Sequence, residues 1–244
     1  GYLSSILLQN NVPVQVIDAP AENLTQPEIL QRIQDFKPDY IGITSNVAIA
    51  YASVCEALYL KIHYPKAKVI LGGPWASSEY ISILENKFAD LVIRGEGEYV
   101  FLEISKTDPG NLAMLSKIQG VSVMLNGKIT DNGQTPYIQD LDSLPFPKWH
   151  LFPKNGYTRT ARAHPFYPLQ TSRGCPYGCI NCTKIIHGMK IRNRSIENIV
   201  RELDYIKEIG GKEIAIEDDM FNYDLKRIKR LLLEIIKRKY GFKI

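Results

Sequence analysis

Thr171-Ser-Arg-Gly-Cys175-Pro-Tyr-Gly-Cys179-Ile-Asn-Cys182 decides how the rest of this 244-residue chain is interpreted, because it holds three of its four cysteines. Their C-x3-C-x2-C spacing is typical of metal ligands rather than of a disulfide framework. Thiolates select zinc, copper(I) or iron–sulfur clusters. Structural zinc sites and ferredoxin-type clusters take four protein ligands. Three close cysteines therefore favour a [4Fe–4S] cluster with one iron open to a substrate or cofactor.

Two other residues bear on this interpretation. His187 is a candidate fourth ligand for the alternative, a zinc site. Cys55 lies in a predicted helix far from the motif, and we interpret it as a core residue. Because free thiols gathered at one site are typical of a reducing compartment, we expect a cytoplasmic protein.

Alternating strands and helices follow the cysteines. The pattern predicts a strand over 168–172, a helix capped by Ser195, a strand over Glu213–Glu217, a helix capped by Asp224 and a strand beginning at Phe242. In a β/α barrel the chemistry lies at the carboxyl ends of the strands. We therefore expect the cysteine loop to share a rim with Glu217 and Asp218. Such carboxylates suit an ammonium group, and solvated loop residues are the alternative.

Residues 1–106 show the same alternation. Strands are predicted over 12–19, 40–44, 69–71 and 91–93, and helices over 3–8, 29–36, 47–62, 79–84 and 98–104. Continuously apolar strands are buried on both faces, which predicts a parallel sheet covered by helices. Such a domain usually begins with a strand at the centre of its sheet, whereas this chain begins with a helix. We therefore expect the first strand to be missing.

Glycines and hydroxyl side chains follow the predicted strands of this sheet. The residues in question are Thr44, Ser45, Gly72, Gly73, Gly95, Glu96 and Gly97. Ligands of open α/β sheets bind beyond the carboxyl ends of the strands, and glycine lets a flat ligand approach the backbone. The sequence thus predicts a ligand site here, with tight strand-to-helix turns as the alternative use of the glycines.

The region 108–167 is predicted to be a linker. Asn126-Gly127 between two apolar runs is a strong hairpin signal. The prolines of the segment 140–149 exclude a regular element there. Trp149, His150 and Phe152 are expected to pack the linker against a domain, and a catalytic His150 is the disfavoured alternative.

Charge and composition argue against a membrane-spanning protein and against a nucleic-acid-binding protein. No apolar run reaches the roughly 18 residues of a membrane span, and no signal peptide is visible. The net charge of +4 is uneven, since residues 1–106 hold 8 Lys/Arg against 12 Asp/Glu. The basic residues of 226–239, which include Arg227, are interpreted as a solvated outer helix face. A nucleic-acid surface is the disfavoured alternative, because no aromatic residues are interleaved with them.

These motifs resemble a known family. Cys175, Cys179 and Cys182, preceded by Ser172-Arg173-Gly174, are similar to the cluster motif of radical SAM enzymes. The runs GITS (42–45), GGPW (72–75), RGEGE (94–98) and DLDSLPFP (140–147) resemble the B12-binding-domain, cobalamin-dependent subgroup. That subgroup includes class B methyltransferases and the anaerobic Mg-protoporphyrin monomethyl ester cyclase. The resemblance implies an α/β fold: a doubly wound, flavodoxin-like cobalamin-binding domain over 1–107, the linker, and the first part of a partial TIM barrel over 168–244.

The resemblance also implies roles for the candidate residues, with no catalytic side chain assigned. The three cysteines ligate the cluster, and S-adenosylmethionine (SAM) chelates the open iron. Tyr177 lies near the adenine of SAM, and Glu217 and Asp218 lie near its amino group. Cobalamin binds at the glycine loops of the first domain. An external flavodoxin- or ferredoxin-type donor supplies the electron that cleaves SAM to a 5′-deoxyadenosyl radical. Methyl transfer to a small organic substrate, or another radical modification of it, follows.

Two departures from the family pattern stand out. The Asp-x-His-x-x-Gly motif that supplies a cobalt ligand in other B12 proteins is absent, and the four histidines, at 63, 150, 164 and 187, fall outside any such pattern. Trp75 stands where relatives commonly have His, and its indole is expected either to stack on the ligand or to block the pocket. The alternative functions are a non-catalytic cluster- or cobalamin-binding protein, a truncated inactive fragment, or a zinc- or cluster-stabilised nucleic-acid module.

Overall fold

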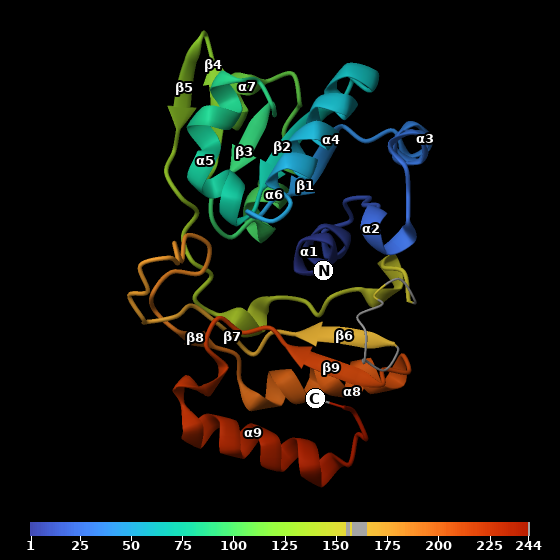
Figure 1. The fold of residues 1–244 in the computed structure, drawn as a ribbon, viewed down its shortest axis with the longest axis vertical. Helices are drawn as coiled ribbons and strands as arrows, with labels where there is room; N and C mark the ends of the chain where they lie inside the picture. Colours follow the sequence, from blue (N-terminus) through green and yellow to red (C-terminus); the bar gives the residue numbers. More distant parts are fainter. Residues whose placement is uncertain (155–156, 158–164, 244) are drawn as a thin grey trace.

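The computed structural model describes residues 1–154, 157 and 165–243, and Figure 1 shows them as two stacked units. The upper unit is built on one five-stranded sheet of order β1-β2-β3-β4-β5. Its strands are β1 (Tyr40–Thr44), β2 (Lys68–Gly72), β3 (Leu91–Ile93), β4 (Val121–Leu125) and β5 (Lys128–Asp131). The first three are parallel, and β4 and β5 are antiparallel to their neighbours. The expected α/β class is confirmed.

Helices cover both faces of this sheet. The helices of this unit are α1 (Tyr2–Gln9), α2 (Ala19–Glu22), α3 (Gln26–Phe36), α4 (Ala50–His63), α5 (Pro74–Glu85), α6 (Glu98–Ser105) and α7 (Leu112–Leu115). Of these, α3, α4 and α5 pack on one face of the sheet, and α6 and α7 on the other. In β2, Val69 and Leu71 join the core formed with α3, α4 and α5, whereas Ile70 joins the core formed with α6 and α7. Successive side chains of a strand point to opposite faces, so burial on both faces requires the uninterrupted apolar run.

The segment 12–19 is not a strand, contrary to the prediction. Residues 12–18 have no regular secondary structure, and Ala19 begins α2. A strand needs a neighbour to receive its backbone hydrogen bonds. The described sheet ends at β1, which offers no pairing to residues 12–18.

The predicted hairpin forms, but it belongs to the first sheet rather than to an isolated linker. Asn126 and Gly127 both take positive φ, as a tight two-residue turn requires. Strand β4 pairs with β3 through Leu91–Val123 and its neighbours, so the first sheet extends to Asp131. This pairing covers an edge of β3 that would otherwise leave backbone groups unsatisfied.

The lower unit is a strand–helix–strand arrangement. Strand β6 (Phe166–Leu169) pairs in parallel with β9 (Glu213–Ile216), and α8 (Ile196–Glu208) and α9 (Leu225–Arg238) pack beside them. The predicted caps are confirmed, since Ser195 Oγ accepts from the Asn198 amide at 3.0 Å and Asp224 Oδ1 from the Arg227 amide at 3.0 Å. Lys243 forms a parallel bridge with Glu213 where a further strand was predicted, and Ile244 lies outside the described residues.

The predicted strand over 168–172 is divided. After β6 the chain leaves β9 at Gln170 and enters a second, antiparallel pair made by β7 (Ser172–Arg173) and β8 (Arg192–Asn193). The cause is the side chain of Asp218, which binds Thr171 and Ser172 and so redirects the chain between the two pairs.

The connecting segment and α1 fill the space between the units. Short 3-10 turns lie at η1 (Leu141–Ser143), η2 (Trp149–Leu151) and, beyond β9, η3 (Phe221–Tyr223). Ile6 of α1 packs with Leu141 and Leu144. Trp149 is buried and contacts the rings of Phe152 and Tyr167, which confirms its packing role. The predicted packing of His150 is wrong, because its side chain is exposed. The histidine at 164 lies outside the described residues.

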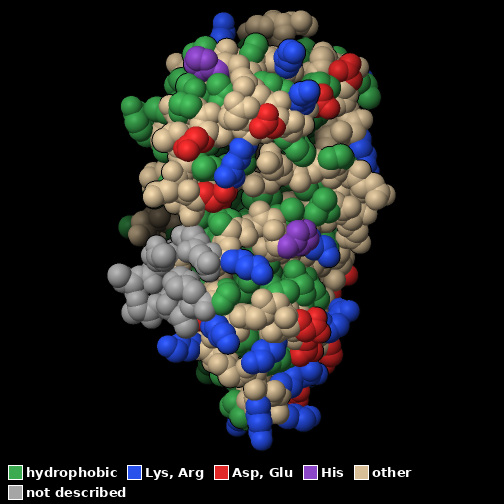
Figure 2. Space-filling view, turned by 90° about the vertical axis from the view of Figure 1, so that its right-hand side faces the viewer, with side chains coloured by type: hydrophobic (Ala, Val, Ile, Leu, Met, Phe, Trp, Pro, Cys, Tyr) green, Lys and Arg blue, Asp and Glu red, His purple; other side chains and the backbone are tan. Residues whose placement is uncertain are grey.

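Charged side chains are distributed as expected, with one exception. Figure 2 shows Lys and Arg side chains over the lower end of the molecule, where α9 lies. Arg227 is the exception, because its guanidinium turns inward and donates to the Thr171 carbonyl at 2.8 Å. No helix within the described residues is both long and apolar enough to cross a membrane.

Candidate functional site

The cysteine motif forms a loop closed at its neck by β7 and β8. Gly174 takes φ +95°, and a Cβ there would lie 2.3 Å from the Lys190 carbonyl oxygen, so only glycine fits. The Cys175 amide donates to the Gly188 carbonyl at 3.1 Å, and the Gly188 amide donates to Lys184 at 2.9 Å. The ends of the loop are therefore held by the backbone, while its middle projects into solvent.

All three thiols of the motif are free. Cys175 is half-buried, and Cys179 and Cys182 are exposed. Soft, unpaired thiolates on an accessible loop fit the ligation of an iron–sulfur cluster. Across the described part of the chain, no three His, Cys, Asp or Glu side chains already surround a common point. The donor chemistry thus fits a cluster, although the side chains are not gathered into a finished metal site.

His187 is engaged by a carboxylate. Its Nδ1 lies 2.8 Å from Asp219 Oδ2, which also accepts from the Gly174 amide at 2.7 Å. The hydrogen bond with His187 lowers the pKa of the Asp219 carboxyl, burial opposes this, and the Gly174 amide adds to the lowering. Nδ1 of His187 thus ties the loop to the end of β9, which leaves Nε2 for a metal, so the zinc alternative stays a prediction.

The three acidic residues after β9 differ in their surroundings. Asp218 accepts hydrogen bonds from the amide and hydroxyl of Thr171 and from the Ser172 hydroxyl at 2.6, 2.5 and 2.7 Å. Glu217 is exposed, and its side chain makes no hydrogen bond or ion pair within the described residues. Of the two residues predicted to lie near an ammonium group, only Glu217 has its carboxylate free for a ligand. Tyr177 is also exposed, at 51%.

The carboxyl ends of β1 and β2 form the rim of the first sheet that faces the lower unit (Figure 1). Thr44 is exposed there, and the Ser45 amide donates to the Gly72 carbonyl at 2.7 Å. Gly73 takes φ +93°, and a Cβ there would meet the Ser45 carbonyl oxygen at 2.6 Å. Ser45 Oγ is fully buried and has no hydrogen-bond partner among the described residues. An unsatisfied hydroxyl beside a close-packed glycine turn fits a polar ligand such as a cobalamin amide.

Trp75 does not project freely over this rim. Its side chain packs against the core that α3, α4 and α5 share with the sheet, and its amide donates to the Ser45 carbonyl at 3.2 Å. Packing against this core accounts for the position of the indole. The two expectations, stacking on a ligand and blocking a pocket, stay predictions.

The loop after β3 is used mainly by the chain itself. Gly95 is buried, and a Cβ there would lie 2.5 Å from Thr135 Oγ1, while Gly97 faces Ile93 and Leu3. The close approach at Gly95 is therefore made by the linker. Glu96, which the sequence placed with the ligand-binding residues, has both carboxylate oxygens bound to protein donors.

Glu96 belongs to a buried ion-pair network between the two units. Its Oε1 lies 2.9 Å from Arg173 Nη1, and its Oε2 lies 2.9 Å from Arg192 Nη1 and 2.6 Å from the Ile138 amide. Glu98 Oε1 lies 2.7 Å from Arg173 Nη2. Burial alone would raise the pKa of Glu96, but the hydrogen bonds from Arg192 and Ile138 and the charge of Arg173 hold it below its ordinary value. Sequence reasoning missed Arg173, Arg192 and Glu98, because no local pattern links residues so far apart.

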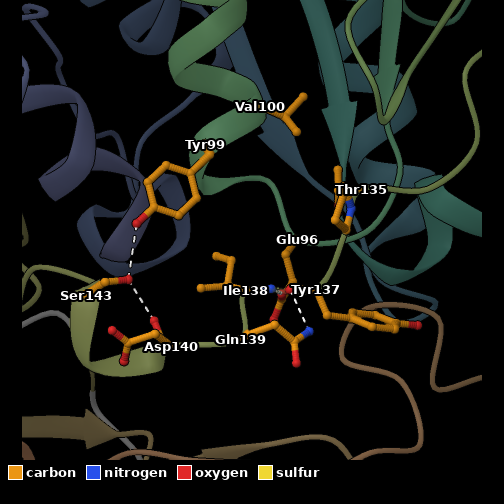
Figure 3. Close-up of a pocket in the computed structure, with 10 residues that line it drawn as sticks. Glu96, Tyr99, Val100, Thr135, Tyr137, Ile138, Gln139, Asp140 and Ser143 are labelled. Atoms are coloured by element: carbon orange, nitrogen blue, oxygen red, sulfur yellow. Dashed lines mark hydrogen bonds between the residues drawn. The ribbon is translucent and has the colours of Figure 1, made fainter.

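A pocket of about 390 Å³ adjoins this network. It lies between α6 and the linker, and Figure 3 shows Tyr99 pointing toward Ser143 across it. Tyr99 Oη and Ser143 Oγ are 3.3 Å apart, and Thr135 Oγ1 is buried without a hydrogen-bond partner among the described residues. Glu96 contributes to its wall, so the pocket and the ion pairs share one junction between the units.

Comparison with known proteins gives one consistent family. Residues 1–105 match the B12 binding domain model. An uncharacterized methyltransferase of Pyrococcus horikoshii is 34% identical over 239 residues, which cover 96% of this chain and 51% of that protein. The anaerobic magnesium-protoporphyrin IX monomethyl ester cyclase of Rubrivivax gelatinosus is 25% identical, over 99% of this chain and 44% of its own length.

A solved structure agrees in fold. The cobalamin-dependent S-adenosylmethionine radical enzyme OxsB, with aqua-cobalamin and S-adenosylmethionine bound, matches 98% of this chain and 34% of its own with a TM-score of 0.75 at 22% identity. This chain thus spans about half the length of the curated relatives it matches.

Proposed function

We propose that this chain, which belongs to the B12-binding-domain radical SAM family, holds a [4Fe–4S] cluster, SAM and cobalamin at the junction of its two units. When bound, these groups supply reductive cleavage of SAM to a 5′-deoxyadenosyl radical and a methyl group for transfer. The observation that carries the proposal is the placement of three free thiols on a loop tied both to the end of β9 and to the loop after β3.

The cysteine loop provides the cluster ligands. Cys175, Cys179 and Cys182 would each supply one thiolate, which leaves one iron of a four-iron cluster without a protein ligand. Asp219 holds the Gly174 amide at the start of the loop, so the first thiol follows directly on a fixed backbone position. The open iron is where the amino and carboxylate groups of SAM would bind, by resemblance to the family.

The remaining contacts to SAM fall to residues with free side chains. Glu217 would accept hydrogen bonds from the SAM ammonium group, because its carboxylate is exposed and has no protein donor within the described residues. Asp218, predicted for the same task, instead fixes Thr171 and Ser172 and so holds the strand end that leads into the loop. Tyr177, exposed within the motif, would lie along the adenine ring.

Cobalamin would bind against the rim formed by Thr44, Ser45, Gly72 and Gly73. The Ser45 hydroxyl, which has no partner among the described residues, would donate to the carbonyl oxygen of an amide group of cobalamin, and the glycine at 73 would let the ligand approach the backbone closely. No Asp-x-His-x-x-Gly motif is present, so cobalt receives no histidine from such a motif. The domain limits 1–107, 108–167 and 168–244 stay a prediction, except that the hairpin of β4 and β5, predicted to lie in the linker, pairs with β3 and belongs to the first unit.

We infer methyl transfer to a small organic molecule as the reaction, since the relative at 34% identity is a methyltransferase. A flavodoxin- or ferredoxin-type protein would donate the electron, and the cytoplasm is the compartment that suits free thiols.

The test is anaerobic incubation of the reconstituted protein with hydroxocobalamin, SAM and dithionite, followed by chromatography for 5′-deoxyadenosine. Formation that depends on Cys179 supports the proposal, and equal formation by a Cys179→Ala variant refutes it.

A further inference from the structure

The neck of the cysteine loop carries two arginines opposite each other. Arg173 of β7 and Arg192 of β8 are direct partners in the antiparallel register. Side chains directly opposite across such a pair lie on the same face, and like charges there destabilise the pairing. Both side chains are buried, at 3% and 4% exposure, so water does not screen their repulsion.

One carboxylate bridges the two guanidinium groups, and a second one completes the charge balance. Glu96 places Oε1 on Arg173 and Oε2 on Arg192, each at 2.9 Å, and its own side chain is 1% exposed. Glu98 adds a second contact to Arg173 at 2.7 Å. Oε1 of Glu96 thus binds β7 and Oε2 binds β8, the two strands of the neck. Glu96 itself belongs to the first unit, in the loop after β3.

The same two arginines are linked to the backbone of the loop. Arg192 Nη2 donates to the His187 carbonyl at 2.9 Å, next to Gly188, whose carbonyl accepts from the Cys175 amide. Arg173 is followed directly by Gly174 and Cys175. A change in the spacing of the two arginines therefore reaches Cys175 by two routes. One is the backbone from Arg173 through Gly174, and the other is the hydrogen bonds of Arg192 with His187 and of Cys175 with Gly188.

We propose that Glu96 is a positioning residue that closes the neck of the cysteine loop, so that the B12-binding unit sets the conformation of the cluster-binding segment. The inference deepens the proposed function and rests on it for the identity of the cluster. The closure itself depends only on the geometry of the chain. Without the Glu96 charge, Glu98 still pairs with Arg173 but Arg192 loses its ion pair, so the two buried guanidinium groups are incompletely neutralised and the neck opens.

The test uses hydrogen–deuterium exchange of the full chain without added iron. In Glu96→Gln, which preserves side-chain size, the amides of residues 174–191 are expected to exchange about tenfold faster, while those of β2 stay unchanged. Glu103→Gln is the matched control, because Glu103 is an exposed carboxylate of α6 with no ion pair among the described residues.

Anaerobic reconstitution with iron and sulfide supplies a second readout. Glu96→Gln is expected to lower the iron content or to shift the EPR signal of the reduced cluster, whereas Glu103→Gln retains both. If the wild-type chain takes up no cluster, the proposed function fails, and the exchange experiment still decides the closure. If the wild-type chain holds a cluster and loop exchange is equal in wild type and Glu96→Gln, the closure is overturned and the proposed function stands. If Glu96→Gln does not fold, Glu98→Gln serves instead, with a smaller effect of the same sign expected.

Discussion

Thr171 and Asp218 are joined by two hydrogen bonds, from the Thr171 amide at 2.6 Å and from its hydroxyl at 2.5 Å. They lie 47 residues apart in the sequence, at the adjacent carboxyl ends of β6 and β9. The pair fixes the point at which the chain leaves β6 and enters the neck of the cysteine loop. The acidic residue predicted for a ligand is thus a structural anchor for the cysteine loop.

Asp218→Asn is expected to destabilise the protein. The amide side chain cannot accept three hydrogen bonds in the same way, and a buried donor left without a partner costs about 1–3 kcal/mol of unfolding free energy. Urea denaturation measures the loss. Glu217→Gln is the control, because the Glu217 side chain is exposed and unpaired within the described residues. Equal stability of wild type and Asp218→Asn would contradict the anchoring role.

Glu217→Gln is expected to weaken SAM binding without affecting the cluster. Its carboxylate is the acidic group at the end of β9 that has no protein donor within the described residues, so its loss removes one charged hydrogen bond to an ammonium group. Titration of the reconstituted protein with SAM, followed by EPR, measures the effect. We expect a right-shifted titration with unchanged iron content. An unchanged titration would exclude Glu217 from the SAM site.

Cys179→Ala is expected to abolish cluster assembly. Two remaining thiols cannot hold a four-iron cluster at the loop, whereas Cys55 lies on α4 in the first unit and is outside the motif. Colorimetric iron and sulfide analysis after anaerobic reconstitution gives the readout. Cys55→Ala should keep the wild-type iron content. Iron retained by Cys179→Ala but lost from Cys55→Ala would reverse the ligand assignment.

The contribution of Glu96 to stability should depend on pH. Its pKa is held below the ordinary value in the folded protein, so its stabilising effect is complete above the unfolded-state pKa and is lost as pH falls through the folded-state pKa. Breaking a buried ion pair costs about 3–5 kcal/mol. We expect the difference in unfolding free energy between wild type and Glu96→Gln to be of that order at pH 7 and to shrink below about pH 4. A difference that grows on acidification would contradict the assigned ion pairs.

Gly73→Ala is expected to impair cobalamin binding. Its positive φ and the Ser45 carbonyl 2.6 Å from a Cβ force the turn to shift, which moves the Ser45 hydroxyl. Gly133→Ala is the matched control, since Gly133 has a similar φ of +74° and open space around it. The visible absorbance of bound hydroxocobalamin after gel filtration gives the comparison. Equal cobalamin retention by both variants would remove the Gly73 turn from the site.

Local patterns in the sequence predicted most of the elements. The apolar run of β2, the Asn126-Gly127 turn and the caps at Ser195 and Asp224 each depend on a few neighbouring residues, and each appears as predicted. The segment 12–19 failed because strand formation depends on a partner elsewhere in the chain, not on β propensity alone. Arg227 failed for a similar reason, since its inward contact with Thr171 is set by the packing of α9.

In the candidate site, too, the features set by neighbouring residues were predicted and those set by distant residues were not. The three cysteines lie within eight residues, so their chemistry is visible in the sequence. The ion pairs of Glu96 join residues that are 77 and 96 positions apart, and nothing in the RGEGE run distinguishes a ligand-binding carboxylate from a structural one. Only the three-dimensional arrangement shows that Glu96 faces the neck of the cysteine loop.

The function proposed for this chain depends first on whether the three thiols hold a SAM-binding [4Fe–4S] cluster. The most direct measurement is EPR of the anaerobically reconstituted, dithionite-reduced protein before and after addition of SAM, with iron and sulfide counted on the same sample. We expect about four iron and four sulfide per chain and a spectrum that changes when SAM binds the open iron. Tightly bound zinc in place of iron, or a cluster spectrum that SAM leaves unchanged, would contradict it.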